Sequence, residues 1–153
     1  MAGFYDYRLS RYRNAYENFQ KAARSARQSS NKIFMQLYTA AVQIRRGRPD
    51  AARKIIETLN ASSNKTALGK IISFLTGTLP SQSFLGPEGP MTPQRCMKEF
   101  FWGLRAELEN DSTAALAHYQ SAMATKQKTC VAYHLSHANA KVLNLRQVQP
   151  GGA

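Results

Sequence analysis

The sequence predicts an all-α protein made of antiparallel helix hairpins stacked side by side. Apolar residues recur at spacings of three and four along most of the chain, which is the pattern of amphipathic helices. No comparable pattern indicates a strand. The chain has 153 residues, of which 43 % are hydrophobic, so it is long enough to bury a core without disulfide or metal staples.

The first 75 residues are predicted to hold four helices and most of the positive charge. The helices are expected over residues 12–26, 32–46, 49–59 and 66–75. Ser29 to Asn31 break the first pattern and offer capping side chains for the second helix. Gly47 suits the end of that helix, and Pro49 suits the first turn of the next. Residues 60–65 are read as a polar turn.

The second half begins with a stretch rich in Pro and Gly at residues 76–93, which is read as a loop or insertion. Phe84 and Leu85 are expected to anchor this stretch to the core. Three further helices are expected over residues 94–109, 112–125 and 129–146, with Thr92 and Asp111 as N-caps of the first two. The predicted organisation is therefore a basic N-terminal half (1–75), a loop (76–93), a C-terminal helical unit (94–147) and a flexible tail (148–153).

Three segments repeat the same spacing of small and large residues. The first is Gly3, Ala15, Phe19, Ala22; the second is Ala40, Ala52, Ile56, Leu59; the third is Gly103, Ala115, Tyr119, Ala122. The steps are 12, 4 and 3 residues in each. This pattern resembles the tetratricopeptide repeat, a unit of two helices in which small residues allow close crossing. The resemblance implies an α-solenoid of about three units.

The sequence departs from the family pattern in several places. Gly3 leaves little room for a first helix, Asp6 stands where the family usually has an aromatic residue, and Leu59 replaces the last small residue. Residues 66–93 are a degenerate unit or an insertion. The short first helix could leave an apolar edge that a partner or a second copy covers, so self-association is possible.

The resemblance implies that the first helices of the units line a concave groove for a partner segment. The expected groove residues are Phe34, Leu37, Ala41, Ile44, Arg45, Met97, Phe100, Leu104, Glu107 and Leu108. They are mostly apolar, which favours an apolar or helical segment of another protein. The predicted function is a non-catalytic protein-binding module, such as an adaptor, an assembly subunit or a chaperone.

The charge is uneven along the chain. Residues 1–75 hold 14 Lys and Arg against 4 acidic residues, whereas residues 76–153 hold 7 against 5. The expected basic patch comprises Arg8, Arg11, Arg13, Arg24, Arg27, Arg45, Arg46, Arg48, Arg53 and Lys54. Such an excess indicates an acidic partner surface. The alternative is a nucleic acid, with Tyr5, Tyr7, Tyr12 and Tyr16 stacking on bases.

The sequence shows no catalytic, metal or cofactor motif. Cys130, His134, His137 and Lys141 share one helical stripe, but zinc and nucleophilic sites both need a further element. The stripe is therefore interpreted as a helix edge or an interface. A disulfide between Cys96 and Cys130 is conceivable, although the sequence cannot judge its geometry. With neither a signal peptide nor an apolar run of membrane-spanning length, the default location is cytoplasmic.

Overall fold

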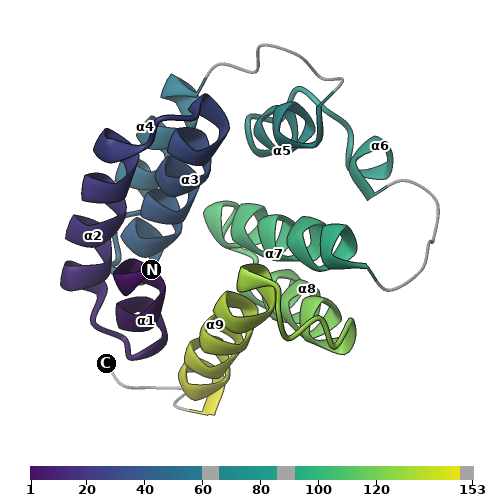
Figure 1. The fold of residues 1–153 in the computed structure, drawn as a ribbon. Coiled ribbons are helices and arrows are strands. Elements are labelled where there is room, and N and C mark those ends of the chain that lie inside the picture. Colours follow the sequence, from purple (N-terminus) through teal and green to yellow (C-terminus); the bar gives the residue numbers. More distant parts are fainter. Residues whose placement is uncertain (60–65, 86–91, 149–153) are drawn as a thin grey trace. The chain divides into compact units, whose positions relative to one another are not determined.

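The computed structural model describes residues 1–59, 66–85 and 92–148, which form nine α-helices and no strand (Figure 1). The all-α prediction is confirmed for these residues. The chain divides into two compact units, Met1–Phe84 and Leu85–Ala153. The turn predicted at 60–65, residues 86–91 of the predicted loop, the side chain of Leu85 and residues 149–153 of the tail lie outside the described part.

In the N-terminal unit, successive members of the first four described helices pack on each other. Its helices are α1 (Ala2–Arg8), α2 (Tyr12–Ser25), α3 (Ser29–Arg45), α4 (Pro49–Thr58), α5 (Ala67–Leu75) and α6 (Ser81–Leu85). Helix α2 packs on α1 and α3, and α3 also packs on α4 (Figure 1). Two short helices were not expected from the sequence, α1 and α6. With seven and five residues, they are too short to show a helical period of apolar residues.

Aromatic side chains fill the space between α1, α2 and α3. The Phe4 ring meets Phe19 edge-on, with ring centroids 4.8 Å apart, and meets Tyr38 in the same way at 4.9 Å. Asp6 lies beside them, only 8 % exposed, and accepts a hydrogen bond of 2.9 Å from Asn18 Nδ2. The departure of Asp6 from the family pattern is thus accommodated by a polar partner on the neighbouring helix.

The stretch predicted to be a loop contains α6, which anchors it to the N-terminal unit. Phe84 is fully buried and stacks on Phe74 of α5, with ring centroids 4.0 Å apart and planes 3° from parallel. The expectation that Phe84 is an anchor is confirmed, because the side chain has no contact with solvent.

The C-terminal unit is a cluster of three mutually packed helices, α7 (Pro93–Leu108), α8 (Ser112–Ala124) and α9 (Val131–Val148). Thr92 and Asp111 cap α7 and α8 as predicted: their side chains accept bonds of 3.2 Å from Arg95 N and 2.9 Å from Ala114 N. The prediction of a flexible tail from residue 148 is wrong at that residue, since α9 continues through Val148.

Four helix ends among the described residues share one turn geometry. A residue with positive φ follows each of α1, α3, α5 and α7: Ser10 at 58°, Gly47 at 72°, Gly77 at 81° and Asn110 at 61°. The next N–H then donates to the carbonyl five residues earlier, at 2.8, 2.8, 2.8 and 2.9 Å, which is the Schellman motif. Successive turns lie 37, 30 and 33 residues apart. The described part of the chain therefore repeats the same helix end at intervals of 30 to 37 residues.

Two hairpins share a close contact between the small and the large residue of the repeated spacing. A Cβ atom on Gly3 would lie 2.7 Å from the Phe19 ring, and one on Gly103 would lie 2.6 Å from the Tyr119 ring. Both rings are buried. In each hairpin, glycine is needed because an aromatic ring from the second helix lies directly against the backbone of the first.

Candidate binding site

Most of the side chains predicted to line a partner groove are buried. Leu37, Ala41, Ile44, Arg45, Phe100, Leu104 and Leu108 are each at most 8 % exposed. Phe34, Met97 and Glu107 are partly exposed, and Glu107 accepts a 2.6 Å hydrogen bond from the Tyr119 hydroxyl. On α3, every residue from Leu37 to Arg45 is buried. The predicted groove thus leaves little side-chain surface for a partner, because these helix faces form core.

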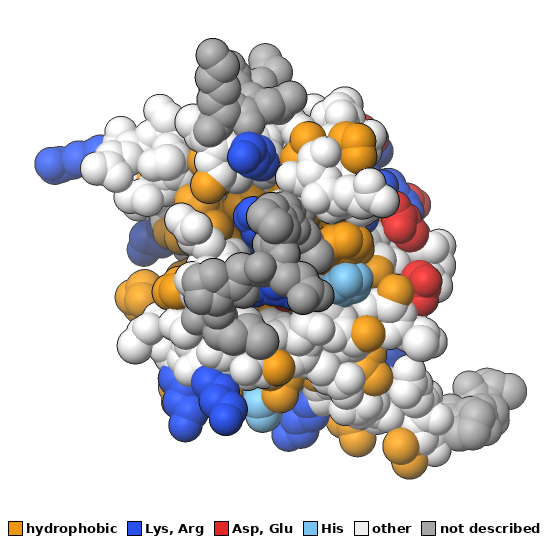
Figure 2. Space-filling model, turned by 90° about the vertical axis from the view of Figure 1, so that its right-hand side faces the viewer, with side chains coloured by type: hydrophobic (Ala, Val, Ile, Leu, Met, Phe, Trp, Pro, Cys, Tyr) orange, Lys and Arg blue, Asp and Glu red, His pale blue; other side chains and the backbone are white. Residues whose placement is uncertain are grey.

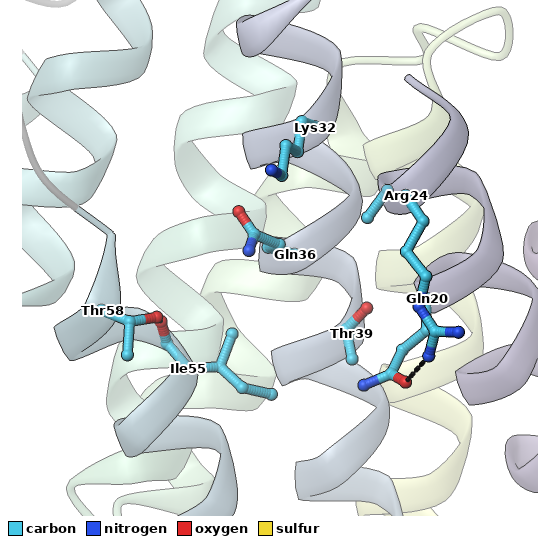
Figure 3. Close-up of a pocket in the computed structure, with 8 residues that line it drawn as sticks. Gln20, Arg24, Lys32, Gln36, Thr39, Ile55 and Thr58 are labelled. Carbon is cyan, nitrogen blue, oxygen red and sulfur yellow. Dashed lines mark hydrogen bonds between the residues drawn. The ribbon is translucent and has the colours of Figure 1, made fainter. Parts of the chain in front are cut away.

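An open pocket of about 430 Å³ lies elsewhere, between α2, α3 and α4 of the N-terminal unit (Figure 3). Its lining residues are Gln20, Ala23, Arg24, Lys32, Gln36, Thr39, Ile55 and Thr58. Figure 3 shows that α2 supplies Gln20 and Arg24, α3 supplies Lys32, Gln36 and Thr39, and α4 supplies Ile55 and Thr58. The pocket is therefore built by two adjoining hairpins.

The local sequence places each lining side chain by helical spacing. Lys32, Gln36 and Thr39 occupy positions i, i+4 and i+7 of α3, so they form one polar stripe on this helix. Gln20 and Arg24 are four residues apart on α2 and face this stripe (Figure 3). Of these lining residues, only Arg24 was predicted from the sequence to belong to a binding surface. The polar stripe of α3 is the sequence feature that could have indicated the other residues.

The charged groups that line the pocket are both cations. Arg24 donates from Nη2 to Gln20 Oε1 at 3.2 Å, which holds the guanidinium over the pocket (Figure 3). Among the described residues, the Lys32 ammonium and the Gln36 amide make no side-chain hydrogen bond or ion pair. The Thr39 and Thr58 hydroxyls donate to the carbonyls of Met35 and Ile55, each at 2.7 Å, so their oxygens can accept from a ligand. The pocket thus offers cationic donors and neutral acceptors.

The predicted basic patch is only partly a surface feature. Arg8, Arg11, Arg13, Arg24, Arg27, Arg48 and Lys54 are exposed, and Arg53 is half-buried. Arg45 is buried and does not contribute to an exposed patch. Arg46 is half-buried and lies over the Tyr16 ring, 5.0 Å from its centroid. Figure 2 shows one face of the molecule, where Lys and Arg lie in several separate places and acidic side chains gather near one edge.

Most of the tyrosines proposed for base stacking are in contact with other side chains of the protein. Tyr7 is fully buried, and Tyr12 packs edge-on against it with ring centroids 5.6 Å apart. Tyr16 carries Arg46 on its face. Tyr5 is 62 % exposed. Of these four tyrosines, only Tyr5 therefore presents an open ring to solvent. Proteins that bind single-stranded nucleic acid usually stack bases on several aromatic rings.

The N-terminal region has an edge of mixed apolar and polar side chains. A second pocket, of about 570 Å³, lies between α1, α2 and the start of α3, and its lining includes Met1, Phe4, Ala22 and Met35. Met1 and Leu9 are 94 % and 45 % exposed. Helix α1 has only seven residues, so it covers α2 incompletely.

The C-terminal unit buries a carboxylate with two basic partners. Glu99 is 3 % exposed; its Oε2 lies 2.8 Å from His118 Nδ1, and its Oε1 lies 3.4 Å from Arg95 Nη2. The His118 ring stacks on Trp102 with centroids 4.5 Å apart. These contacts tie α7 to α8 and supply the charge pairing that a buried carboxylate needs.

The stripe on α9 does not assemble a metal centre. His137 and Lys141 are exposed, and His134 donates from Nε2 to the Lys128 carbonyl at 2.7 Å. No cluster of three His, Cys, Asp or Glu suited to a metal ion occurs in the described ranges. The fold does, however, bring Cys96 into contact with Cys130, which the sequence could not show.

Comparison with known proteins gives no relative: no family model, no curated protein and no solved structure matches this chain. Across the part of the chain that the structure describes, none of the helices combines the length and apolar character needed to cross a bilayer. Any functional conclusion therefore rests on the chain's own geometry.

Proposed function

We propose that this protein is a tetratricopeptide-like, non-catalytic binding module, and that its N-terminal unit holds an acidic segment of a partner protein in the pocket between α2, α3 and α4. The observation that carries the proposal is the composition of this pocket: Arg24 and Lys32 are its charged groups, and both are cationic. The four turns of shared geometry, spaced 37, 30 and 33 residues apart, support the repeat architecture.

The shape and chemistry of the pocket favour an extended peptide. A volume of about 430 Å³ accommodates a few side chains of a peptide rather than a whole protein surface. Carboxylates would pair with Arg24 and Lys32, while peptide N–H groups would donate to the oxygens of Thr39 and Thr58. The side chain of Ile55 supplies an apolar contact in the same lining.

The surrounding charge supports the same class of partner. Residues 1–75 carry a net charge of +10, from 14 basic and 4 acidic residues. Such a field raises the rate at which an acidic partner meets the pocket. Nucleic acid fits less well, since Tyr7, Tyr12 and Tyr16 are buried or covered by neighbours.

A binding assay with matched charge variants tests the proposal. The probe is a fluorescein-labelled peptide of alternating Glu and Leu, with a Gln and Leu peptide as its neutral counterpart, measured by fluorescence polarisation. The double variant Arg24→Gln, Lys32→Gln should weaken binding about 30-fold, at roughly 1 kcal/mol for each charge contact. The double variant Arg11→Gln, Lys54→Gln removes the same charge at exposed positions outside the pocket, and should change binding less than about threefold.

Two outcomes would contradict the proposal. If both double variants weaken binding equally, the pocket has no special role and the peptide responds to net charge alone. If a single-stranded oligonucleotide binds more tightly than the peptide at ~150 mM salt, with affinity that falls steeply as salt rises, the basic half serves nucleic acid instead.

A further inference from the structure

The two cysteines of the chain, far apart in sequence, meet in the C-terminal unit. Cys96 lies in the first turns of α7, and Cys130 directly precedes α9. Both are free thiols. The Cys130 sulfur lies 3.8 Å from the carbonyl oxygen of Pro93, which is the first residue of α7 and lies three residues before Cys96. The two thiols influence each other's pKa, and both cysteines lie at the start of α7.

The two thiols have different surroundings. Cys130 is partly exposed and directly precedes α9, so the N-terminus of that helix favours its thiolate. His134 lies close enough to add positive charge when it is protonated. Such groups stabilise a thiolate. Cys130 is thus the thiol that a reagent in solution can reach.

Cys96, in contrast, is shielded from solvent. It is fully buried, and the groups that face it are the Cys130 thiol, the Thr125 hydroxyl and the Glu99 carboxylate. Its hydrogen bond to Cys130 and its burial raise the pKa of the Cys96 thiol well above the ordinary range. The same hydrogen bond, followed by the backbone N–H groups of Ala132 and Tyr133, lowers the pKa of Cys130 to about 6. The pair therefore consists of an exposed nucleophile and a shielded proton donor.

We propose that Cys130 and Cys96 form a redox-active dithiol that exchanges with low-molecular-weight disulfides, with Cys130 as the attacking thiol and Cys96 as the resolving thiol. This site is independent of the peptide pocket, because it lies wholly within the C-terminal unit. It adds a thiol–disulfide exchange activity to a module whose proposed role is binding.

The exchange proceeds in two balanced steps. The Cys130 thiolate attacks one sulfur of an external disulfide, forming a mixed disulfide and expelling the other half as a thiolate, which takes a proton from water. Cys96 then gives its proton to solvent and attacks the Cys130 sulfur, forming the Cys96–Cys130 bond and expelling the second thiolate, which is protonated in turn. Two protein thiols are oxidised, and the external disulfide is reduced to two thiols.

Mass spectrometry of the full chain after incubation with oxidised glutathione tests the mechanism. The native protein should lose two hydrogen atoms and retain no glutathione. Cys96→Ser should accumulate one glutathione on Cys130, because the resolving thiol is missing. Cys130→Ser should remain unmodified, because Cys96 is buried. Far-UV circular dichroism of both variants checks that they are folded.

The pH profile of alkylation supplies an independent measurement. With iodoacetamide, Cys130 of the native protein should keep about half its plateau rate at pH 6, as its pKa of about 6 requires, while buried Cys96 stays unmodified. A thiol with the ordinary pKa of about 8.5 would keep only about one three-hundredth of its plateau rate at that pH. In Cys96→Ala, which removes the hydrogen-bond donor, the midpoint should move to higher pH.

Three results would overturn the proposal. The native protein could stop at the mixed disulfide with glutathione retained, it could form only disulfide-linked dimers on a non-reducing gel, or Cys130 could alkylate with a midpoint near pH 8.5. Each would show that the two sulfurs do not act as an attacking and a resolving pair.

Discussion

Replacing Gly103 with Ala tests the packing that the repeated spacing specifies. A Cβ at this position would lie 2.6, 2.8 and 2.9 Å from Cε1, Cδ1 and Cζ of Tyr119. The ring cannot easily retreat, because it is fully buried, lies 6.0 Å from the Phe100 ring and is held by a 2.6 Å bond from its hydroxyl to Glu107. The added methyl group must therefore displace a rigid side chain.

The size of the effect follows from two opposing contributions. Overpacking a core site destabilises by about 1–3 kcal/mol, whereas Gly→Ala within a helix stabilises by about 1 kcal/mol. We expect Gly103→Ala to lower the free energy of unfolding by up to roughly 2 kcal/mol. In urea this moves the midpoint down by up to roughly 1 M. Trp102, the single tryptophan of the chain, stacks on His118 in the same unit and reports its unfolding by fluorescence.

A double-mutant cycle separates packing from helix propensity. In a Tyr119→Leu background the ring is absent, so Gly103→Ala should become neutral or stabilising by up to about 1 kcal/mol. The reasoning is refuted if Gly103→Ala stabilises the otherwise native protein. It is equally refuted if the substitution has the same effect in both backgrounds, because the ring would then have no part in it.

Three further predictions concern other contacts. Asn18→Ala should destabilise the N-terminal unit by about 1–3 kcal/mol, because buried Asp6 loses the donor at 2.9 Å; urea unfolding followed by circular dichroism measures this loss. Phe84→Ala should cost about 3–5 kcal/mol in the same assay, because its stack on Phe74 is fully buried. The urea midpoint, followed by tryptophan fluorescence, should rise between pH 6 and pH 8.5 and should rise less in Cys130→Ser. The sign follows because the pKa of about 6 in the folded state lies below the unfolded value, so the unfolded state binds more protons and the stabilisation is lost as pH falls through 6.

Exposed neighbours provide the controls for these changes. Asn14→Ala on α2 and Gln82→Ala on α6 alter exposed side chains and should each stay within about 0.5 kcal/mol of the native protein. If Asn14→Ala costs as much as Asn18→Ala, the loss reflects α2 in general and not the bond to Asp6. If Phe84→Ala lowers the free energy of unfolding no more than Gln82→Ala does, the Phe84 side chain does not anchor α6. If Cys130→Ser keeps the full rise with pH, another group is responsible.

Local rules predicted the long helices well and several of their ends. The exception is Ser29 to Asn31, which were expected to cap the second helix but lie inside α3, whose N-cap is Gln28. The expected helix at 112–125 corresponds to Ser112–Ala124, and its cap Asp111 accepts the predicted kind of bond. The spacing of Gly3 and Phe19 likewise predicted close helix crossing, which the structure confirms. These features depend on residues within one or two turns of each other, or on side-chain size at fixed helical positions. Helices α1 and α6 escaped detection because they contain less than two full turns.

The candidate sites were harder to predict, because a helix can be covered on more than one face. Leu37 and Phe100 were expected to line a groove, but both are fully buried. Conversely, Lys32 was not predicted as a binding residue, although it lines the same pocket as Arg24 of the neighbouring helix. Which apolar stripe becomes core and which polar stripe becomes a pocket depends on all the neighbouring helices together.

The sequence by itself determined the helical class, the caps Thr92 and Asp111, the uneven charge and the small residues at the close helix crossings. Each of these follows from period, side-chain volume or formal charge, which are properties of short segments. Only the tertiary structure decided that Arg45 is buried, that Arg24 and Lys32 share a pocket, and that Cys96 touches Cys130. Those facts depend on how separate helices pack, since a contact between distant residues is set by the path of the whole chain between them.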